Sequence, residues 1–295
     1  MKEDKSKNTN SNPAFRIGGD LTVKRLGYGA MRLTGKGVWG WPDDKKSAYQ
    51  ILRRVIEMGI NLIDTADAYG PEVSELLIAE ALYPYPDGLV IATKGGLTRP
   101  GPGKWVPNGQ PDYLTKCVEK SLQRLQVERI DLYQLHRIDP KVPVEDSLGA
   151  LKALQDAGKI RHVGLSEVKP REIERARKVL PIVSVQNEYN IANRKSEETL
   201  RYCEKEDIGF IPWFPVGGGD TDLTRTGGTL AKEAERHGVS VTQLALAWLL
   251  QHSTVILPIP GTSSLAHLEE NMASVELTLT PEEWKRIEGL ALGFR

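Results

Sequence analysis

Seven short apolar runs, each ending in a polar or aromatic side chain, recur along this 295-residue chain. Most neighbouring runs begin roughly 25–45 residues apart, which is the length of a strand, a helix and two loops. The runs are 61–64 (NLID), 89–94 (LVIATK), 129–136 (RIDLYQLH), 160–166 (IRHVGLS), 181–186 (PIVSVQ), 209–213 (GFIPW) and 254–262 (TVILPIPGT). This rhythm predicts repeated βα units with parallel strands.

The side chains that close these runs are the first candidates for a functional site. If the strands are parallel, all their carboxyl ends meet at one mouth, where barrel enzymes keep their chemistry. These residues are Asp64, Lys94, His136, Ser166, Gln186, Trp213 and Thr262.

The length suits one large α/β domain, because a closed barrel needs about 250 residues plus insertions. We therefore predict a single (β/α)8 TIM barrel over residues 14–295, preceded by a disordered polar tail at 1–13. Residues 14–24 predict an N-terminal β-hairpin around a Gly-Gly-Asp turn, and 25–31 a first strand. Residues 280–290 begin with Thr-Pro-Glu-Glu and predict an extra C-terminal helix.

Helices are expected between the strands, where apolar residues keep a spacing of three and four. The first is capped by Asp43 or Asp44 and ends before Gly59. The others are expected at 72–82, 112–126, 144–157, 170–180, 196–206, 240–251 and 263–272.

Composition excludes several classes of partner. The formal net charge is 0, so no basic surface for nucleic acid or anionic membranes is expected. Long apolar stretches and a signal peptide are lacking, which favours a cytoplasmic location. Cys117 and Cys203 show no metal-ligand spacing, so we expect free thiols in helices and no metal site. A monomer or weak homo-oligomer is expected, since no heptad pattern is present.

Three Gly- and Pro-rich stretches, 32–43, 95–111 and 214–228, interrupt the pattern after strands. Long loops on one face of a compact domain are often functional. Trp39, Trp41 and Trp105 lie in the first two, and we expect them to line a substrate pocket.

Asp64, Tyr69, Lys94 and His136 together suggest a device that donates a proton to a carbonyl oxygen. A free tyrosine has a pKa of about 10, and a nearby ammonium lowers it. Lys94 would supply that charge, and Asp64 would hold Lys94 and offset its burial. His136 would hydrogen-bond the substrate oxygen. The four residues in this order predict reduction of a carbonyl compound, with Tyr69 as the general acid.

Such a reaction needs a hydride source. Ser166 and Gln186 could hydrogen-bond a carboxamide, and Trp213 offers a flat face for stacking a nicotinamide ring. The Gly-Thr-Ser-Ser turn at 261–264 opens a helix whose N–H groups suit a phosphate. No GxGxxG follows the first strand, so a Rossmann site is not supported.

The chain resembles an aldo-keto reductase from about residue 15 to residue 290. The matching stretches are RLGYGAMR, NLIDTADAYG, IATK, DLYQLHR, VGLSEV, VQNEYN, WFPVGGG and PIPGTSS…HLEEN. This resemblance implies a barrel with NADPH, or possibly NADH, extended across the mouth, and a small carbonyl substrate. The residues it places on the cofactor are Gly29, Ala30, Met31, Asp64, Ser166, Gln186, Trp213, Pro215, Val216, Gly217, Gly261, Thr262, Ser263, Ser264, His267, Glu270 and Asn271.

Two departures from the family pattern bear on the cofactor. The family usually has Asn where this chain has Glu167, and a carboxylate cannot donate to a carboxamide. The region around the 2′-phosphate usually carries a Lys and an Arg, where Gly261 and His267 stand here. Preference for NADPH would then depend on Thr262 and the following serines.

Further stretches, including ALYPYPDGLVIATK and VQNEYNIANR, resemble bacterial pyridoxal reductases. Pyridoxal is therefore one substrate hypothesis, and Arg32, Arg99 and Arg137 near the mouth could serve a substrate with an anionic group. Three alternatives stay open. They are a cofactor-sensing regulatory subunit, a barrel enzyme using Lys94 as a Schiff-base amine, and a sugar or polyol dehydrogenase working in reverse.

Overall fold

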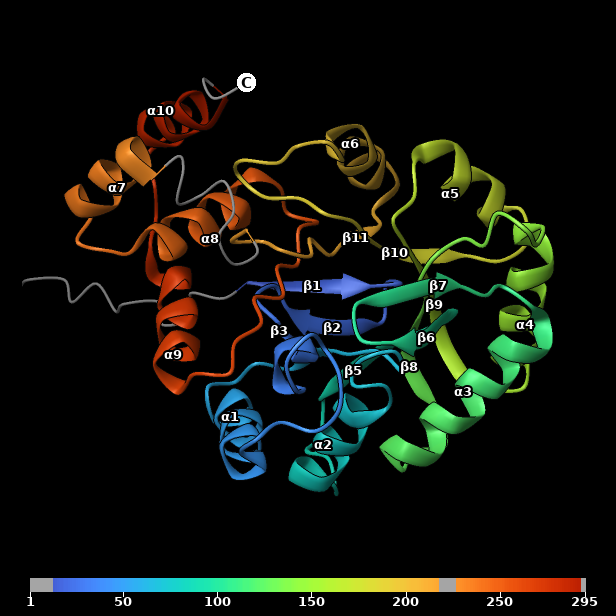
Figure 1. The fold of residues 1–295 in the computed structure, drawn as a ribbon. Helices are drawn as coiled ribbons and strands as arrows, with labels where there is room; N and C mark the ends of the chain where they lie inside the picture. The colour runs from blue at the N-terminus through green and yellow to red at the C-terminus, as the bar shows by residue number, and fades with distance from the viewer. Residues whose placement is uncertain (1–12, 218–226, 293–295) are drawn as a thin grey trace, which may run out of the picture.

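A curled parallel sheet of seven strands forms the centre of the molecule (Figure 1). The computed structural model describes residues 13–217 and 227–292. Each strand pairs with its neighbour in the order β3-β4-β5-β8-β9-β10-β11. The strands are β3 (Tyr28–Gly29), β4 (Leu62–Asp64), β5 (Val90–Gly95), β8 (Ile130–Leu135), β9 (Ile160–Ser166), β10 (Ile182–Gln186) and β11 (Gly209–Phe210). The predicted α/β class with parallel strands is confirmed.

Helices α1 to α6 surround this sheet on its outer side (Figure 1). The helices are α1 (Lys45–Glu57), α2 (Val73–Leu82), α3 (Pro111–Leu125), α4 (Val144–Asp156), α5 (Pro170–Arg177), α6 (Glu197–Glu206), α7 (Gly227–Arg236), α8 (Val241–His252), α9 (Leu265–Ala273) and α10 (Pro281–Leu292). Helix α1 begins as predicted, because the Asp44 carboxylate accepts hydrogen bonds from the amides of Lys46 and Ser47. The predicted helices are all present. Helix α7 was not predicted from the sequence.

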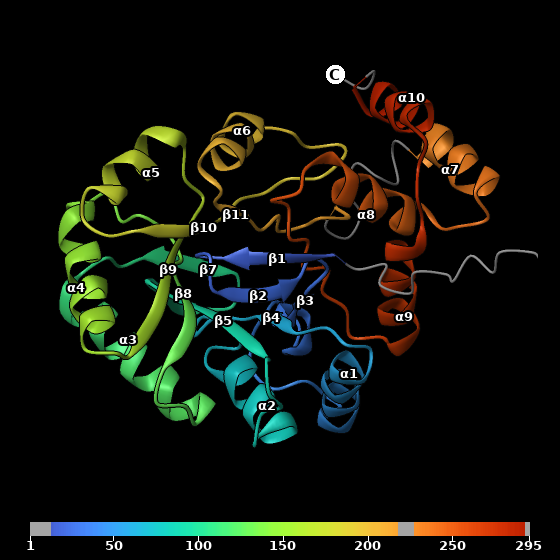
Figure 2. The same ribbon diagram turned by 180° about the vertical axis from the view of Figure 1, so that it is seen from behind.

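The chain begins with an antiparallel hairpin that packs on the inner side of the sheet. Strand β1 (Ala14–Ile17) pairs with β2 (Leu21–Lys24), and Figure 2 shows them across the centre of the helix ring. Ile17, Leu21 and Val23 are buried in one cluster with Leu62 and Val90, near the starts of their strands. The hairpin therefore covers the end of the sheet where the strands begin, opposite the candidate site.

The stretch 95–111 is more ordered than predicted. Strands β6 (Leu97–Gly101) and β7 (Lys104–Pro107) form an antiparallel hairpin, with Gly103 at a φ of +70° in the turn. The long loop predicted here therefore contains a short hairpin with a Gly-containing turn, which the sequence analysis did not foresee.

The last predicted strands are shorter than expected. Strand β11 ends before Pro212, and 254–262 pairs as a strand only at the bridge of Ile256 with Phe210. Prolines at 212, 258 and 260 lack the N–H that a sheet requires. The segment still joins both sheet edges, since Leu257 N donates to Phe210 O over 2.8 Å and Gly27 N donates to Pro258 O over 2.9 Å.

The first predicted strand, 25–31, is also shorter. Only Tyr28–Gly29 pairs as β3, and the 3-10 helix η1 (Ala30–Leu33) follows directly. A second 3-10 turn, η2 (Ser274–Glu276), follows α9. The predicted disordered tail lies outside the described residues except for Pro13.

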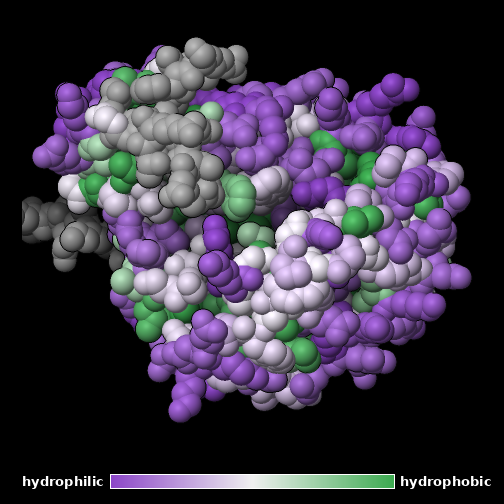
Figure 3. Space-filling view, in the orientation of Figure 1, coloured by the Kyte–Doolittle hydropathy of each residue, from purple (hydrophilic) through white to green (hydrophobic). Residues whose placement is uncertain are grey.

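Both cysteines are buried free thiols, as expected. No helix in the described part of the chain combines the length and apolar character that a membrane crossing requires. The face seen in Figure 3 is mostly hydrophilic and is hollowed near its centre, where apolar residues are visible.

Candidate active site

The ends of β4 and β5 bring Asp64 and Lys94 into direct contact. Lys94 Nζ lies 2.6 Å from Asp64 Oδ1, 2.8 Å from the carbonyl oxygen of Thr65 and 3.3 Å from Tyr69 Oη. The Lys94 side chain is fully buried. The structure thus brings the predicted phenol, ammonium and carboxylate together within hydrogen-bonding distance.

The protonation of this group follows from its burial. Burial raises the pKa of Tyr69, and the positive charge of Lys94 opposes this without reversing it. Burial alone would lower the pKa of Lys94, but Asp64 and Tyr69 together raise it above its ordinary value. Lys94 thus acts in the predicted direction and lowers the pKa of Tyr69, but desolvation of the phenolate, which the prediction did not include, is the larger effect. Tyr69 holds its proton and Lys94 its charge.

His136 lies beside Tyr69 at the end of β8. The two rings meet edge to face, with centroids 5.8 Å apart and an interplanar angle of 82°. Burial, and then the positive charges of Lys94 and Arg137, hold the pKa of His136 well below its ordinary value. The imidazole is therefore neutral and can serve as a hydrogen-bond partner without adding charge.

Asp64 is held by two amides as well as by Lys94. Gln134 Nε2 and Gln186 Nε2 donate to Asp64 Oδ2 over 3.1 Å and 2.8 Å. The sequence reading missed Gln134, although its position two residues before His136 places it on the same face of β8. Gln186, predicted to hold a carboxamide, uses its amide nitrogen on Asp64.

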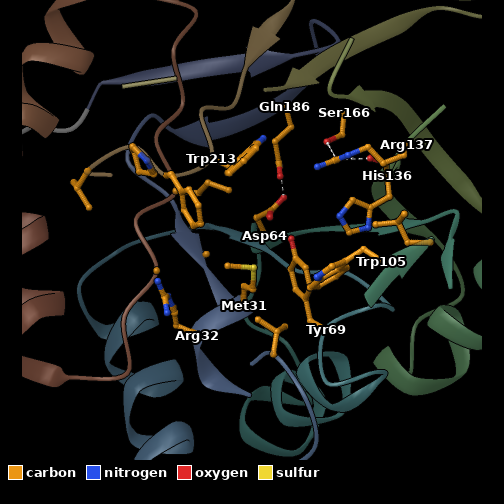
Figure 4. A pocket seen from close by; sticks show the side chains of 18 of the residues that line it. Met31, Arg32, Asp64, Tyr69, Trp105, His136, Arg137, Ser166, Gln186 and Trp213 are labelled. Carbon is orange, nitrogen blue, oxygen red and sulfur yellow. Dashed lines mark hydrogen bonds between the residues drawn. The ribbon is translucent and has the colours of Figure 1, made fainter. Parts of the chain in front are cut away.

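Asp64, Tyr69, His136 and Gln186 line a cavity of about 630 Å³, whereas Lys94 and Gln134 are outside its lining. Figure 4 shows Tyr69, Trp105 and His136 on one side of it and Trp213 and Arg32 on the other. The lining residues are Gly29, Met31, Arg32, Val38, Asp64, Tyr69, Leu97, Trp105, Pro107, His136, Arg137, Ser166, Gln186, Trp213, Phe214, Pro215, Val216, Gly217, Ile259 and Gly261. The sequence reading missed the apolar members Val38, Leu97, Pro107, Phe214 and Ile259, which carry no polar signal.

Of the three loop tryptophans, one reaches the cavity. Trp105 lines it from β7. Trp39 is outside the lining and pairs with Gly70 in an isolated bridge. Trp41 is 41% exposed, with Lys45 Nζ 3.7 Å above its ring. The predicted placement of Trp39 and Trp41 in the cavity lining is therefore not what the structure shows: Lys45 lies over the Trp41 ring, and Arg99 Cζ lies 5.4 Å from the centroid of the Trp39 ring.

Glu167 binds the indole of Trp213. Its Oε1 accepts from Trp213 Nε1 over 2.7 Å and from the amide of Glu188 over 2.8 Å. Glu167 has a φ of +56°, a conformation unusual for a residue with a Cβ. The Glu167 carboxylate therefore orients the ring of Trp213, which is predicted to stack on the nicotinamide. This is the role of Glu167 at the position where the family usually has Asn.

At the opposite side, two backbone segments approach closely. A Cβ on Gly261 would lie 2.6 Å from Gly29 O, and one on Gly29 would lie 2.7 Å from Ile259 O. Arg32 borders this contact, with its Cγ 3.6 Å from the same hypothetical Cβ of Gly261. Glycine at both positions lets the backbone lie open to the cavity.

Helix α9 begins beside this contact. Ser264 is its N-cap and accepts from the amide of His267 over 3.4 Å. Glu270 accepts a hydrogen bond from the hydroxyl of Ser240. Seven predicted cofactor residues lie outside the cavity lining: Ala30, Thr262, Ser263, Ser264, His267, Glu270 and Asn271. Within the described residues, no group of three or more His, Cys, Asp or Glu could hold a metal ion.

Comparisons with known proteins agree with this geometry. The model of the aldo/keto reductase family matches residues 25–291. An uncharacterized oxidoreductase of Schizosaccharomyces pombe is 51% identical, over 92% of this chain and 87% of the relative. Pyridoxine 4-dehydrogenase of Escherichia coli is 43% identical, over 92% of this chain and 96% of the relative.

Among solved structures, the glycerol dehydrogenase of Gluconobacter oxydans aligns with a TM-score of 0.85 at 28% identity. The alignment covers 96% of this chain and 95% of that one. With its family model, its relatives and its fold in agreement, the chain belongs to the aldo/keto reductase family.

Proposed function

We propose that this protein is an NADPH-dependent reductase that converts an aldehyde or ketone to an alcohol. The observation that carries the proposal is the contact of buried Lys94 with Tyr69 and Asp64, which both line a largely apolar cavity. A buried acid held next to a buried ammonium is suited to giving up a proton and stabilising the anion that remains.

The residues around the cavity fit a nicotinamide cofactor. Trp213 offers a ring face, and Gly29, Gly261 and Arg32 line the same cavity, where the guanidinium could contact a phosphate. NADPH bound there would supply a hydride to the carbonyl carbon. Tyr69 would give its proton to the carbonyl oxygen, and Lys94 would stabilise the tyrosinate left behind. Neutral His136 would orient the oxygen.

Pyridoxal is the first substrate to test. The pyridoxine 4-dehydrogenase of Escherichia coli shares 43% identity, and its name describes the reverse reaction. Trp105 and Leu97 line the cavity and would contact a flat ring. Because the named relatives are alcohol dehydrogenases, the assay should run in both directions, with glycerol and polyols in the oxidative one.

The test combines turnover with cofactor binding. Tyr69→Phe removes the acidic hydroxyl and keeps the ring, so we expect kcat for carbonyl reduction to fall at least about 100-fold. The dissociation constant for NADPH, measured by nicotinamide fluorescence, should change less than about threefold, because the hydroxyl bonds Lys94 and not the phosphates.

Undiminished turnover of Tyr69→Phe would remove this residue from the mechanism. Tight NADPH binding by the native chain without oxidation by any carbonyl compound would instead favour the cofactor-sensing regulatory alternative.

We also propose that 255–258 takes the place of an eighth strand and closes the barrel. Its hydrogen bonds to Phe210 on one side and Gly27 on the other support this arrangement.

A further inference from the structure

We propose that the substrate carries an anionic oxygen close to its reacting carbonyl group and that Arg137 binds it. This inference rests on the proposed function and adds a substrate class to it. The class is aldehydes and ketones with an ionised carboxylate, phenolate or similar oxygen on a neighbouring carbon.

Arg137 is held in place at the cavity wall. It follows His136 after β8, and its Nη1 donates to His136 O over 2.6 Å and to Ser166 Oγ over 2.9 Å. Figure 4 shows it next to both residues. Both of these hydrogen bonds use one nitrogen of the guanidinium, Nη1. The planar fork has five N–H donors, so the remaining donors are available for two parallel bonds to an anion.

Arg137 forms no direct ion pair in the described part of the chain. No carboxylate oxygen there lies within 4.0 Å of it, whereas the shielded Arg124 and Arg194 each contact a glutamate. Arg25 and Arg99 also lack a carboxylate, but their guanidinium groups bond backbone carbonyls outside the cavity lining. Arg137 is therefore distinctive as a fixed cation facing the cavity.

The other charges of the cavity do not cancel it. Asp64 is paired with Lys94. Glu167 acts on Arg137 from beyond ion-pair distance and raises its pKa, but burial outweighs this effect, and Oε1 of Glu167 accepts from Trp213 and the Glu188 amide. His136 is neutral, and burial lowers the pKa of Arg137, which shows that its charge is partly desolvated. An incompletely solvated cation is costly unless an anion pairs with it.

Location distinguishes this cation from one that serves the cofactor phosphates. Arg137 directly follows the histidine that faces Tyr69, whereas Arg32 borders the Gly29 and Gly261 contact on the other side in Figure 4. An anion bound by Arg137 would thus lie near the carbonyl. Trp105 and Leu97 in the same wall favour an aromatic body for the molecule.

The test compares two substrates with the same skeleton. 2-Formylbenzoate carries a carboxylate beside the aldehyde, and its methyl ester is neutral. We expect the native enzyme with saturating NADPH to prefer the anion in kcat/KM. In Arg137→Gln that preference should fall about 100-fold, because an unpaired anion at a desolvated site is strongly penalised. In Arg137→Lys, the kcat/KM preference for the anion should lie between those of the native enzyme and Arg137→Gln. Arg171→Gln, on the exposed surface of α5, should keep the native preference.

Two results would overturn the proposal. One is an equal loss on both substrates with weaker NADPH binding, which would make Arg137 a support for Ser166 and the cofactor. The other is a native enzyme that prefers the ester. If the native chain oxidises NADPH with neither substrate nor with pyridoxal or any other carbonyl compound tested, the proposed function fails. Binding of phthalate, measured calorimetrically with and without NADP⁺, then tests separately whether Arg137 binds an anion. Arg137→Gln should lose phthalate binding, and unchanged binding in this variant would refute the assignment.

Discussion

At the scale of single residues, the site combines a charged pair with groups that burial keeps neutral. Asp67, in the loop that carries Tyr69, is the clearest example. Burial, together with the nearby charge of Glu75, raises its pKa to about 7, and its Oδ1 has no hydrogen-bond partner. The backbone N–H of Asp67 donates a hydrogen bond to the carbonyl oxygen of Lys94 over 3.1 Å, and this bond fixes the position of Asp67 in the loop.

Asp67 gives a prediction about pH and stability. In the unfolded chain this carboxyl ionises near pH 3.9, whereas the folded protein retains its proton up to about pH 7. The contribution of the protonated Asp67 to the free energy of unfolding is therefore fully present at low pH and declines as the pH rises through this window. Asp67→Asn mimics the protonated form and should raise the free energy of unfolding at pH 8 by about 2–4 kcal/mol.

Urea unfolding at several pH values checks this, with the exposed Asp87→Asn as the control. If the free energy of unfolding of Asp67→Asn depends on pH as strongly as that of the native protein, Asp67 is already ionised in the folded protein.

At the scale of elements, the contact between the β3 end and the 259–261 segment shapes the side of the cavity that we propose for the cofactor. Gly261→Ala would place a methyl group 2.6 Å from the carbonyl oxygen of Gly29, and backbone cannot yield as a flexible side chain can. We expect a loss of about 1–3 kcal/mol in the free energy of unfolding and weaker NADPH binding. Denaturant unfolding and fluorescence titration measure the two effects.

Gly149→Ala is a control of opposite sign. Gly149 lies in the exposed face of α4 with no atom within 4 Å of its hypothetical Cβ. Alanine there should stabilise the helix by about 0.5–1 kcal/mol. If Gly261→Ala were equally harmless, the two segments would have to be further apart than 2.6 Å implies.

The same elements show what sequence could and could not predict. Helices such as α1 were predicted because capping and apolar spacing are local. The meeting of Asp64, Lys94 and His136 followed from the common edge of parallel strands. Three features could not be predicted, because they join distant residues or depend on register. They are the close backbone approach of Gly261 to Gly29, the support of Asp64 by Gln134, and the pairing of β6 with β7. The prediction that Trp41 lines the substrate pocket was wrong because the side chain of Lys45 lies over its ring.

At the scale of the whole molecule, the first and last parts of the chain hold each other through one buried cation. Arg25 follows β2 and is 6% exposed. Its Nε donates to Ile256 O over 3.1 Å, and its Nη2 donates to Leu250 O over 2.7 Å and also to Ser253 O. Leu250 and Ser253 lie at the C-terminal end of α8, where a positive charge is favourable. One guanidinium therefore links the N-terminal hairpin to α8 and to the segment that joins both sheet edges.

Arg25→Met keeps most of the apolar stem and removes all three bonds, leaving carbonyl groups buried without a donor. We expect the free energy of unfolding to fall by about 3–5 kcal/mol, because each lost bond came from a charged donor. Urea unfolding of the full chain tests this, with Arg16→Met on the exposed face of β1 as the matched control. Equal stabilities of the two variants would mean that the ring of elements is held by apolar packing alone. A selective loss in Arg25→Met would show that contacts between chain ends, more than 220 residues apart, are needed for the fold to form as one unit.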